Sequence, residues 1–278
     1  MTRLSQFIDA AAAALAEAGV PAPRVDAELL AAHVAGAERG RLALIDADTD
    51  FPDRYDDLIA RRAQRIPLQH LIGSAPFGPV EVRVGPGVFT PRPETEALLE
   101  WAMARSLPER PVIVDLCTGS GALALALTRH FPTARVIAVD DSPTALDYAR
   151  RNLADTAVEL VAADVTVAGL LPELDGAVDL VVANPPYIPD GARLEPEVAD
   201  HDPAHALFGG PDGMQVIDAI TVLAARWLVD GGHCAIEHDD TTSRRTVESF
   251  ARTKAFDDIT ARCDFAGRPR FVTARRTT

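Results

Sequence analysis

Basic residues, and lysine above all, are scarce in this sequence. Lys254 is the single lysine, and 27 Lys and Arg residues stand against 41 Asp and Glu, which gives a formal net charge of −14. Proteins that wrap nucleic acid need basic clusters that displace counterions from phosphates. The arginines here are scattered. The charge therefore disfavours stable nucleic-acid binding and fits a small molecule or a protein as the substrate better.

Cysteine and long apolar runs are scarce as well. Cys117, Cys234 and Cys263 lie far apart and form no Cys-x-x-Cys pair, which is typical of proteins from a reducing cytoplasm. No apolar run approaches the roughly 18 residues of a membrane span. The Ala-rich start of the chain carries Asp9 and Glu17, which indicates a helix and not a secretory signal. We therefore expect a cytoplasmic protein that does not contact a membrane.

A metal site is not expected. His201 and His205 have the spacing of a ligand pair on a helix, but Pro203 interrupts that helix and no third ligand is evident. His33 and His70 have no ligand-spaced partner, so we interpret both as structural.

The first part of the chain, residues 1–73, is predicted to be helical. Apolar residues recur at helical spacing and give one buried stripe. In the first predicted helix these residues are Leu4, Phe7, Ile8, Ala11, Ala12 and Leu15. No catalytic grouping accompanies them, so a small helical bundle is expected. Residues 74–90 change character, because Gly and Pro bracket an alternating apolar run at 80–84, which predicts a β-hairpin linker.

From residue 111 onward, strand-like and helix-like segments alternate. The predicted strands are 111–114, 134–139, 158–162, 178–183 and 232–237, and the predicted helices are 120–130, 142–153 and 206–229, with Ser142 as an N-cap. Such alternation implies βαβ units and an open, mostly parallel α/β sheet. Ligands of such sheets bind at the carboxyl ends of the strands, where this chain places polar residues.

The first of these polar segments is the loop 115–121. Gly119 and Gly121 let a ligand approach the backbone where a helix begins. With Ala124, and with Asp140 about 20 residues further on, the loop also satisfies the dinucleotide fingerprint. Asp115 argues against a dinucleotide, because a carboxylate would crowd a pyrophosphate. It can instead balance the cationic S-adenosylmethionine, which carries a sulfonium, an ammonium and no phosphate.

Acidic residues follow the next two strands. Asp140 is predicted to accept from both ribose hydroxyls, and we prefer it to the adjacent Asp141 because it comes first after the strand. Asp164 is predicted to accept from the adenine amine. The full set of residues expected to bind the cofactor is Asp115, Cys117, Thr118, Gly119, Ser120, Gly121, Asp140, Asp164, Val165 and Asn184.

The turn Asn184-Pro185-Pro186-Tyr187 follows the fourth predicted strand. Two prolines fix φ and remove two donors, which makes the turn stiff. The Asn184 side-chain oxygen and the Pro185 carbonyl can accept both hydrogens of one NH₂ group, and Tyr187 can stack on the flat group that bears it. An amide nitrogen is a poor nucleophile, and holding both hydrogens leaves its lone pair aimed at the sulfonium methyl. Asn184, Pro185 and Tyr187 are therefore the predicted catalytic residues, and Pro186 joins them in binding the substrate.

This turn and the loop 115–121 together resemble class I methyltransferases that act on exocyclic or amide nitrogens. Four further segments resemble the release factor glutamine methyltransferase family: 67–73 (PLQHLIG), 90–96 (TPRPETE), 202–207 (DPAHAL) and 264–268 (DFAGR). The resemblance implies methylation of the glutamine side-chain amide in the Gly-Gly-Gln motif of peptide chain release factors, which act in translation termination. It also implies that residues 1–73 help to recognise the release factor and that 91–278 form a Rossmann-like methyltransferase domain.

The sequence departs from this family at a few positions and leaves alternatives open. Cys117 stands where the family commonly has Gly, and Val165 stands where some relatives have an aromatic residue. A ribosomal-protein glutamine methyltransferase or an adenine-specific DNA methyltransferase would use the same turn, the latter on a flipped base. A nicotinamide oxidoreductase would explain the glycines and Asp140 but not the turn, and a non-catalytic binding module is the remaining alternative.

Overall fold

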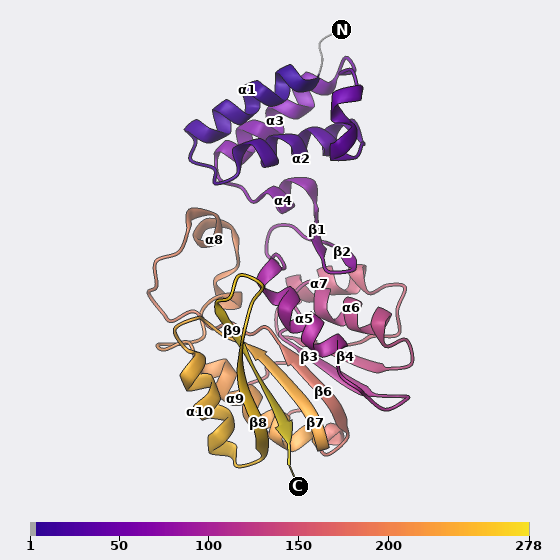
Figure 1. Cartoon of the computed structure of the whole chain (residues 1–278), viewed down its shortest axis with the longest axis vertical. Coiled ribbons are helices and arrows are strands. Elements are labelled where there is room, and N and C mark those ends of the chain that lie inside the picture. The colour runs from indigo at the N-terminus through magenta and orange to yellow at the C-terminus, as the bar shows by residue number, and fades with distance from the viewer. Residues whose placement is uncertain (1–3, 278) are drawn as a thin grey trace. The chain divides into compact units, whose positions relative to one another are not determined.

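The computed structural model describes residues 4–277, which form two compact units (Figure 1). The first unit runs to Ser74 and also takes in the later segment Leu194–His201. The second comprises Ala75–Arg193 and the chain from Asp202 onward. No described helix is long and apolar enough to cross a membrane.

The first unit is built from short helices around one apolar core. Its helices are α1 (Leu4–Glu17), α2 (Pro23–Ala35), α3 (Phe51–Ala63), α4 (Leu68–Ile72) and α8 (Pro196–His201), with a 3₁₀ helix at Arg39–Leu44. The predicted stripe of α1 is buried at Leu4, Ile8, Ala11 and Leu15. Phe51 stacks on Tyr55 with ring centroids 5.1 Å apart, and the Tyr55 hydroxyl donates to the Ala27 carbonyl at 2.9 Å. The ring contact lies within α3, and the hydrogen bond to Ala27 joins α3 to α2.

A buried ion-pair cluster ties α8 into this unit. Arg62 of α3 donates from Nε to Asp26 Oδ2 at 2.7 Å and from Nη2 to Glu197 Oε1 at 2.9 Å. Arg65 donates from Nε to the same Glu197 oxygen at 2.9 Å. The chain segment that follows the Asn184 turn is therefore held by two arginines of the N-terminal bundle.

The second unit begins with a two-stranded sheet and a short helix. Strands β1 (Ser74–Phe77) and β2 (Val80–Arg83) pair with each other, as the hairpin prediction required. The residues of β2 alternate between buried and exposed. A 3₁₀ turn at Pro93–Thr95 then leads into α5 (Glu96–Met103).

The main sheet has seven strands in the order β5-β4-β3-β6-β7-β9-β8. Their bounds are β3 (Val112–Leu116), β4 (Arg135–Asp140), β5 (Glu159–Ala162), β6 (Val178–Ala183), β7 (Leu228–Glu237), β8 (Phe256–Cys263) and β9 (Pro269–Arg276). The first five strands in this order pair in parallel, and β9 is antiparallel to both of its neighbours. The prediction of an open, mostly parallel sheet is confirmed. The order reverses between β3 and β6, which is where such sheets bind ligands.

Helices cover both faces of this sheet (Figure 1). One face packs against α5, α6 (Ala122–His130) and α7 (Pro143–Asn152), and the other against α9 (Gln215–Trp227) and α10 (Ser243–Thr253). Neighbouring residues of β6 alternate between the two cores: Leu180 and Val182 enter the first, and Val181 and Ala183 enter the second. This double burial explains why the strand is continuously apolar.

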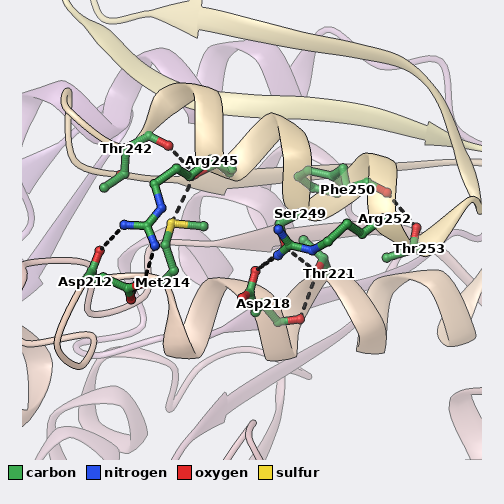
Figure 2. A network of polar contacts seen from close by, with 11 residues as sticks. Asp212, Met214, Asp218, Thr221, Thr242, Arg245, Ser249, Phe250, Arg252 and Thr253 are labelled. Atoms are coloured by element: carbon green, nitrogen blue, oxygen red, sulfur yellow. Dashed lines mark hydrogen bonds and ion pairs between the residues drawn. The ribbon is translucent and has the colours of Figure 1, made fainter.

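Polar contacts join α9 to α10 on the second face (Figure 2). Asp218 of α9 accepts from Arg252 of α10 at 2.7 Å and also from Ser249. Thr221 and Ser249 share a buried hydrogen bond of 3.0 Å. These contacts join the two helices that cover this face of the sheet.

One helix prediction is partly wrong. Helix was expected over 206–229, whereas a 3₁₀ turn at Ala204–Ala206 is followed by a loop and α9 begins only at Gln215. The loop forms because its backbone pairs with the residue after the Asn184 turn: Ile188 N donates to Leu207 O at 2.8 Å, and Gly209 N donates to Ile188 O at 2.9 Å. The Ser142 N-cap is confirmed, since its side chain accepts from Ala145 N.

Candidate functional site

Asp115 lies at the carboxyl end of β3 and fastens the loop that follows. Its side chain is fully buried, and Oδ2 accepts from Thr118 Oγ1 at 2.6 Å and from Ala124 N at 3.1 Å. The buried Oδ1 has no hydrogen-bond partner within residues 4–277. Burial raises the pKa of Asp115 to about 7. A cation placed at Oδ1 would satisfy this oxygen and favour the ionised carboxylate.

The two glycines of the loop serve different purposes. Both have positive φ, +56° at Gly119 and +82° at Gly121. A Cβ on Gly119 would meet no protein atom within 4 Å, so the backbone there is open to a ligand. A Cβ on Gly121 would lie 3.1 Å from Leu153 Cδ1. Gly121 is therefore needed for packing against the end of α7, which the sequence prediction did not anticipate.

Cys117 adopts the left-handed conformation without being glycine, with φ at +58°. This conformation costs roughly 1–2 kcal/mol for a residue with a side chain. Burial is the main cause that raises the pKa of its thiol, and nearby carboxylates add to it. Those carboxylates belong to Asp140, Asp115, Asp141 and Asp164. The acidic residues that end β3, β4 and β5 thus gather around one thiol, which makes this end of the sheet suited to a cationic ligand.

Asp140 at the end of β4 holds the same loop from the neighbouring strand. Its Oδ2 accepts from Gly119 N at 2.8 Å, and its Oδ1 accepts from Ser142 N at 2.9 Å. Burial raises its pKa, while these two backbone donors lower it. Each carboxylate oxygen can accept a second hydrogen bond, so Asp140 retains the capacity to bind a diol.

Asp164 and Val165 follow β5 and differ in burial. Asp164 is exposed, and its Oδ1 accepts from both the backbone N (2.8 Å) and the hydroxyl (2.6 Å) of Thr166, which lowers its pKa. Val165 is buried in the core of the α9 face. Thr118 and Ser120 are buried as well. The Thr118 hydroxyl donates to Asp115, and the Ser120 carbonyl accepts from Asn152 Nδ2 at 2.8 Å.

The turn 184–187 follows β6, the strand next to β3. The Asn184 side chain is half-buried, and its Nδ2 donates to Thr95 Oγ1 at 3.2 Å. Its Oδ1 is therefore the atom left to accept from a ligand. The Pro185 carbonyl also has no backbone donor within the described chain. This turn consequently offers two acceptors beside a loop suited to a cation.

The backbone of the segment 207–213 packs closely against the backbone of this turn. A Cβ on Gly209 would lie 2.5 Å from Pro186 O, and one on Gly213 would lie 2.2 Å from Tyr187 O. No side chain fits at either place, so both glycines are required by the close approach of two backbones. The sequence analysis did not single out either residue, although Gly209-Gly210 and Gly213 stood within a predicted helix that they disfavour.

Glu237 is a site residue that the sequence analysis missed. It ends β7, is 1% exposed, and accepts from the Tyr187 hydroxyl at Oε1, 2.9 Å away. Burial raises its pKa to about 7. The available signal was an acidic residue at the end of a predicted strand, the same signal that identified Asp115 and Asp140. The Tyr187 ring is held through its hydroxyl, and its predicted stacking on the substrate stays a prediction.

Residues 90–96 connect the segments that carry the family resemblance. Arg92 forms an ion pair with the buried Asp202 of the DPAHAL segment. Glu94 accepts from Arg268 of the DFAGR segment at 3.0 Å, and Thr95 accepts from Asn184. Residues 90–96 thus contact two other segments of the family resemblance and the Asn184 turn. The described residues hold no group of three or more His, Cys, Asp or Glu side chains placed to bind a metal ion.

Comparisons with known proteins give matches to both parts of the chain. Residues 6–73 match a family model described as the PrmC N-terminal domain, and residues 80–201 match one described as the methyltransferase small domain. The chain is 68% identical to a release factor glutamine methyltransferase of Mycolicibacterium smegmatis, over 99% of both chains. It is 66% identical to a protein of that name from Mycobacterium tuberculosis, over 98% of this chain and 91% of that one.

Among solved structures, a methyltransferase from Pyrococcus furiosus is similar with a TM-score of 0.55 at 18% identity. The match covers 79% of this chain and all of that one. At this identity the likeness concerns the fold alone, which is that of a class I methyltransferase.

Proposed function

Because the chain belongs to the release factor glutamine methyltransferase family, we propose that it methylates the glutamine side-chain amide in the Gly-Gly-Gln motif of peptide chain release factors. The observation that carries this proposal is the turn 184–187, where Asn184 Oδ1 and the Pro185 carbonyl are both left as acceptors. One primary amide needs such a pair for its two hydrogens.

The residues at the ends of β3, β4 and β5 fit S-adenosylmethionine. When bound, this cofactor supplies an electrophilic methyl carbon on a positively charged sulfur. Asp115 Oδ1, buried and without a partner in residues 4–277, suits the ammonium group. Asp140 has capacity left for the ribose diol, and Gly119 leaves the backbone open. Asp164 lies exposed at the next strand end, where it suits the adenine amine.

Asn184 and Pro185 would hold the acceptor amide by both hydrogens. This grip keeps the nitrogen lone pair out of the hydrogen bonds and turns it toward the methyl group. The Tyr187 hydroxyl is fixed by Glu237, so the ring stays in place as a flat wall for the amide. Positioning and charge then lower the barrier. The amide nitrogen would gain the methyl carbon as the bond between this carbon and the cofactor sulfur breaks and leaves its electron pair on the sulfur. The nitrogen would then lose one proton to solvent.

We further propose that residues 1–73 recognise the release factor and that the enzyme acts in the cytoplasm, where release factors work. The net charge of −14 and the single lysine support a protein substrate over DNA or RNA. The first unit also contains Leu194–His201, which follows the acceptor-binding turn closely in sequence.

Labelled S-adenosylmethionine and a purified release factor provide the direct test. Mass mapping should find one added methyl group on the Gly-Gly-Gln glutamine, and none when that glutamine is replaced by asparagine. Ribosomal proteins and an adenine-containing DNA duplex serve as competing acceptors in the same assay. Preferential labelling of either one would contradict the proposed substrate.

A further inference from the structure

Residues from three distant parts of the sequence form a buried polar chain behind the Asn184 side chain. Asn184 Nδ2 donates to Thr95 Oγ1 at 3.2 Å, and the Tyr187 hydroxyl donates to Glu237 Oε1 at 2.9 Å. The Thr95 hydroxyl also acts on the Glu237 carboxyl and lowers its pKa. Thr95 and Glu237 are 3% and 1% exposed, so solvent barely competes for these bonds.

The direction of each bond in this chain depends on Glu237. A hydroxyl carries one hydrogen, and Thr95 uses its lone pair to accept from Asn184, so its hydrogen is available for Glu237. An ionised carboxylate only accepts. It therefore requires both Thr95 and Tyr187 to donate toward it. A protonated carboxyl could donate to Thr95 instead, whose hydrogen would then turn toward Asn184 and attract the amide oxygen in place of Nδ2.

We propose that Glu237 is a positioning residue for methyl transfer, whose carboxylate acts through Thr95 to keep Asn184 Oδ1 directed at the acceptor amide and acts directly on Tyr187 to hold its ring. This inference rests on the proposed function and deepens it, because it assigns the orientation of the acceptor-binding turn to a residue at the end of β7 and to the segment 90–96.

The surroundings of Glu237 allow its charge to change near neutral pH. Burial raises its pKa to about 7, against the hydrogen bonds from Thr95 and Tyr187 and the charge of Arg270, which lower it, while Glu94 raises it. Glu237 Oε2 and Arg270 Nε are buried and lack a hydrogen-bond partner of normal geometry within residues 4–277. His238, the next residue, has a pKa lowered by burial, so it stays neutral. The chain of hydrogen bonds should acquire its fixed direction as the pH rises through about 7.

Replacing Glu237 by glutamine keeps its size and removes its charge. A carboxamide has one acceptor oxygen, and its nitrogen only donates, so a hydroxyl that faces the nitrogen can no longer donate to this side chain as it does to a carboxylate. We expect Glu237→Gln to lower kcat about tenfold or more, with KM for the cofactor within about twofold of the wild type. The rise of kcat through about pH 7 should disappear. The profile is measured at saturating cofactor, so that the effect of Asp115 on cofactor affinity does not contribute to it.

Substitutions at Thr95 test the same chain at a second point. Thr95→Ser keeps the hydroxyl and should retain near wild-type kcat, whereas Thr95→Val matches the size without a hydroxyl and should lose about as much as Glu237→Gln. The double variant Thr95→Val with Glu237→Gln should be no slower than the slower single variant, because both interrupt one chain. Glu159→Gln is the matched control, since its carboxylate pairs with Arg135 at the exposed start of β5.

The assay is methyl transfer to a purified release factor by the full chain. Wild-type kcat in Glu237→Gln, or equal losses in Thr95→Ser and Thr95→Val, would overturn the positioning role. If Glu237→Gln does not fold, as judged by circular dichroism, the two Thr95 variants decide. A wild-type enzyme that leaves the glutamine unmodified would contradict the proposed function, whereas an active wild type with unaffected variants would contradict only the role of Glu237.

Discussion

Arg62 and Glu197 are joined by a hydrogen-bonded ion pair of 2.9 Å that spans 135 residues of sequence. The Arg62 side chain is 4% exposed and also pairs with Asp26 at 2.7 Å. One buried cation therefore serves two carboxylates, one from α2 and one from the segment beyond the acceptor-binding turn. A buried charge that loses its partner is costly. Glu197 would keep its ion pair with Arg65, whereas Asp26 has no second ion pair among the described residues.

Removing this cation should destabilise the first unit strongly. Arg62→Ala is expected to lower the free energy of unfolding by about 3–5 kcal/mol, measured by denaturant titration. The adjacent Arg61→Ala is the control, because Arg61 is 46% exposed and lies 3.6 Å from Asp57; exposed pairs contribute about 1 kcal/mol or less. Similar losses in the two variants would show that burial of the cluster does not matter.

Asn184→Ala should separate chemistry from cofactor binding. The substitution removes Oδ1 and with it one of the two proposed acceptors for the substrate amide. We expect methyl transfer to fall by about 10²-fold or more, with the cofactor Kd near that of the wild type in calorimetry. Transfer at the wild-type rate would exclude this residue from the reaction.

Asp140→Ala should weaken cofactor binding, whereas the same substitution at the neighbouring Asp141 should not. Alanine removes the proposed ribose acceptor and also frees Gly119 N and Ser142 N, which Asp140 now accepts from. An increase in cofactor Kd of about 10- to 100-fold is expected. Asp141→Ala is the matched control, since Asp141 is exposed beside it. If calorimetry finds equal affinities in both variants, the ribose assignment is wrong.

Cofactor affinity should depend on pH through Asp115. Burial raises the pKa of this carboxyl to about 7, so it is mainly protonated at about pH 6 and mainly ionised at about pH 8. A ligand ammonium binds the ionised form, so affinity should rise with pH, by about tenfold over this range. In Asp115→Asn the contribution of this group is absent. Parallel pH profiles for the wild type and this variant would refute the assignment.

Two glycines near the turn allow a steric test. Gly213 and Gly191 both have positive φ, +74° and +79°, but a Cβ would lie 2.2 Å from Tyr187 O at Gly213 and would meet nothing within 4 Å at Gly191. Gly191→Ala should therefore cost only about 1–2 kcal/mol of backbone strain. Gly213→Ala should cost more in thermal unfolding and should also slow methyl transfer, since the turn must shift. Equal stability and activity would argue against the close backbone approach.

The sequence predicted the sheet well because its parallel strands are buried on both faces. Continuous apolar runs such as 178–183 are hard to mistake when Gly and polar residues bound them, and each strand ended near the predicted position. The helix expected over 206–229 began too early, because Ala206 and Leu207 are as compatible with a helix as with a loop. The loop forms here because Leu207 and Gly209 pair with Ile188 through their backbones. No local sequence pattern reveals this pairing.

The sequence points to candidate site residues where the local pattern marks them. It does not point to residues whose contacts lie far away in the sequence. Asp115, Asp140 and Asn184 lie at or just after the ends of strands. This position, together with the Gly-rich loop and the Asn-Pro-Pro-Tyr turn, led to their prediction as site residues. Glu237 ends a strand as well, but its importance comes from Tyr187, 50 residues away in sequence. Thr95 lies 89 residues from Asn184. Periodicity and spacing carry no information about such pairs, so a sequence without its fold cannot assign them.

The segment Leu194–His201 has a practical consequence for dissecting the protein. Its contacts belong to the first unit, while the chain on either side of it belongs to the second. A fragment that starts at Ala75 would retain Glu197 but lack Arg62 and Arg65. The segment that follows its acceptor-binding turn would then have lost both arginine partners of Glu197. The two units are interleaved along the polypeptide. Cutting the chain between residues 74 and 75 therefore does not give an intact catalytic unit, and both units have to be expressed as one polypeptide.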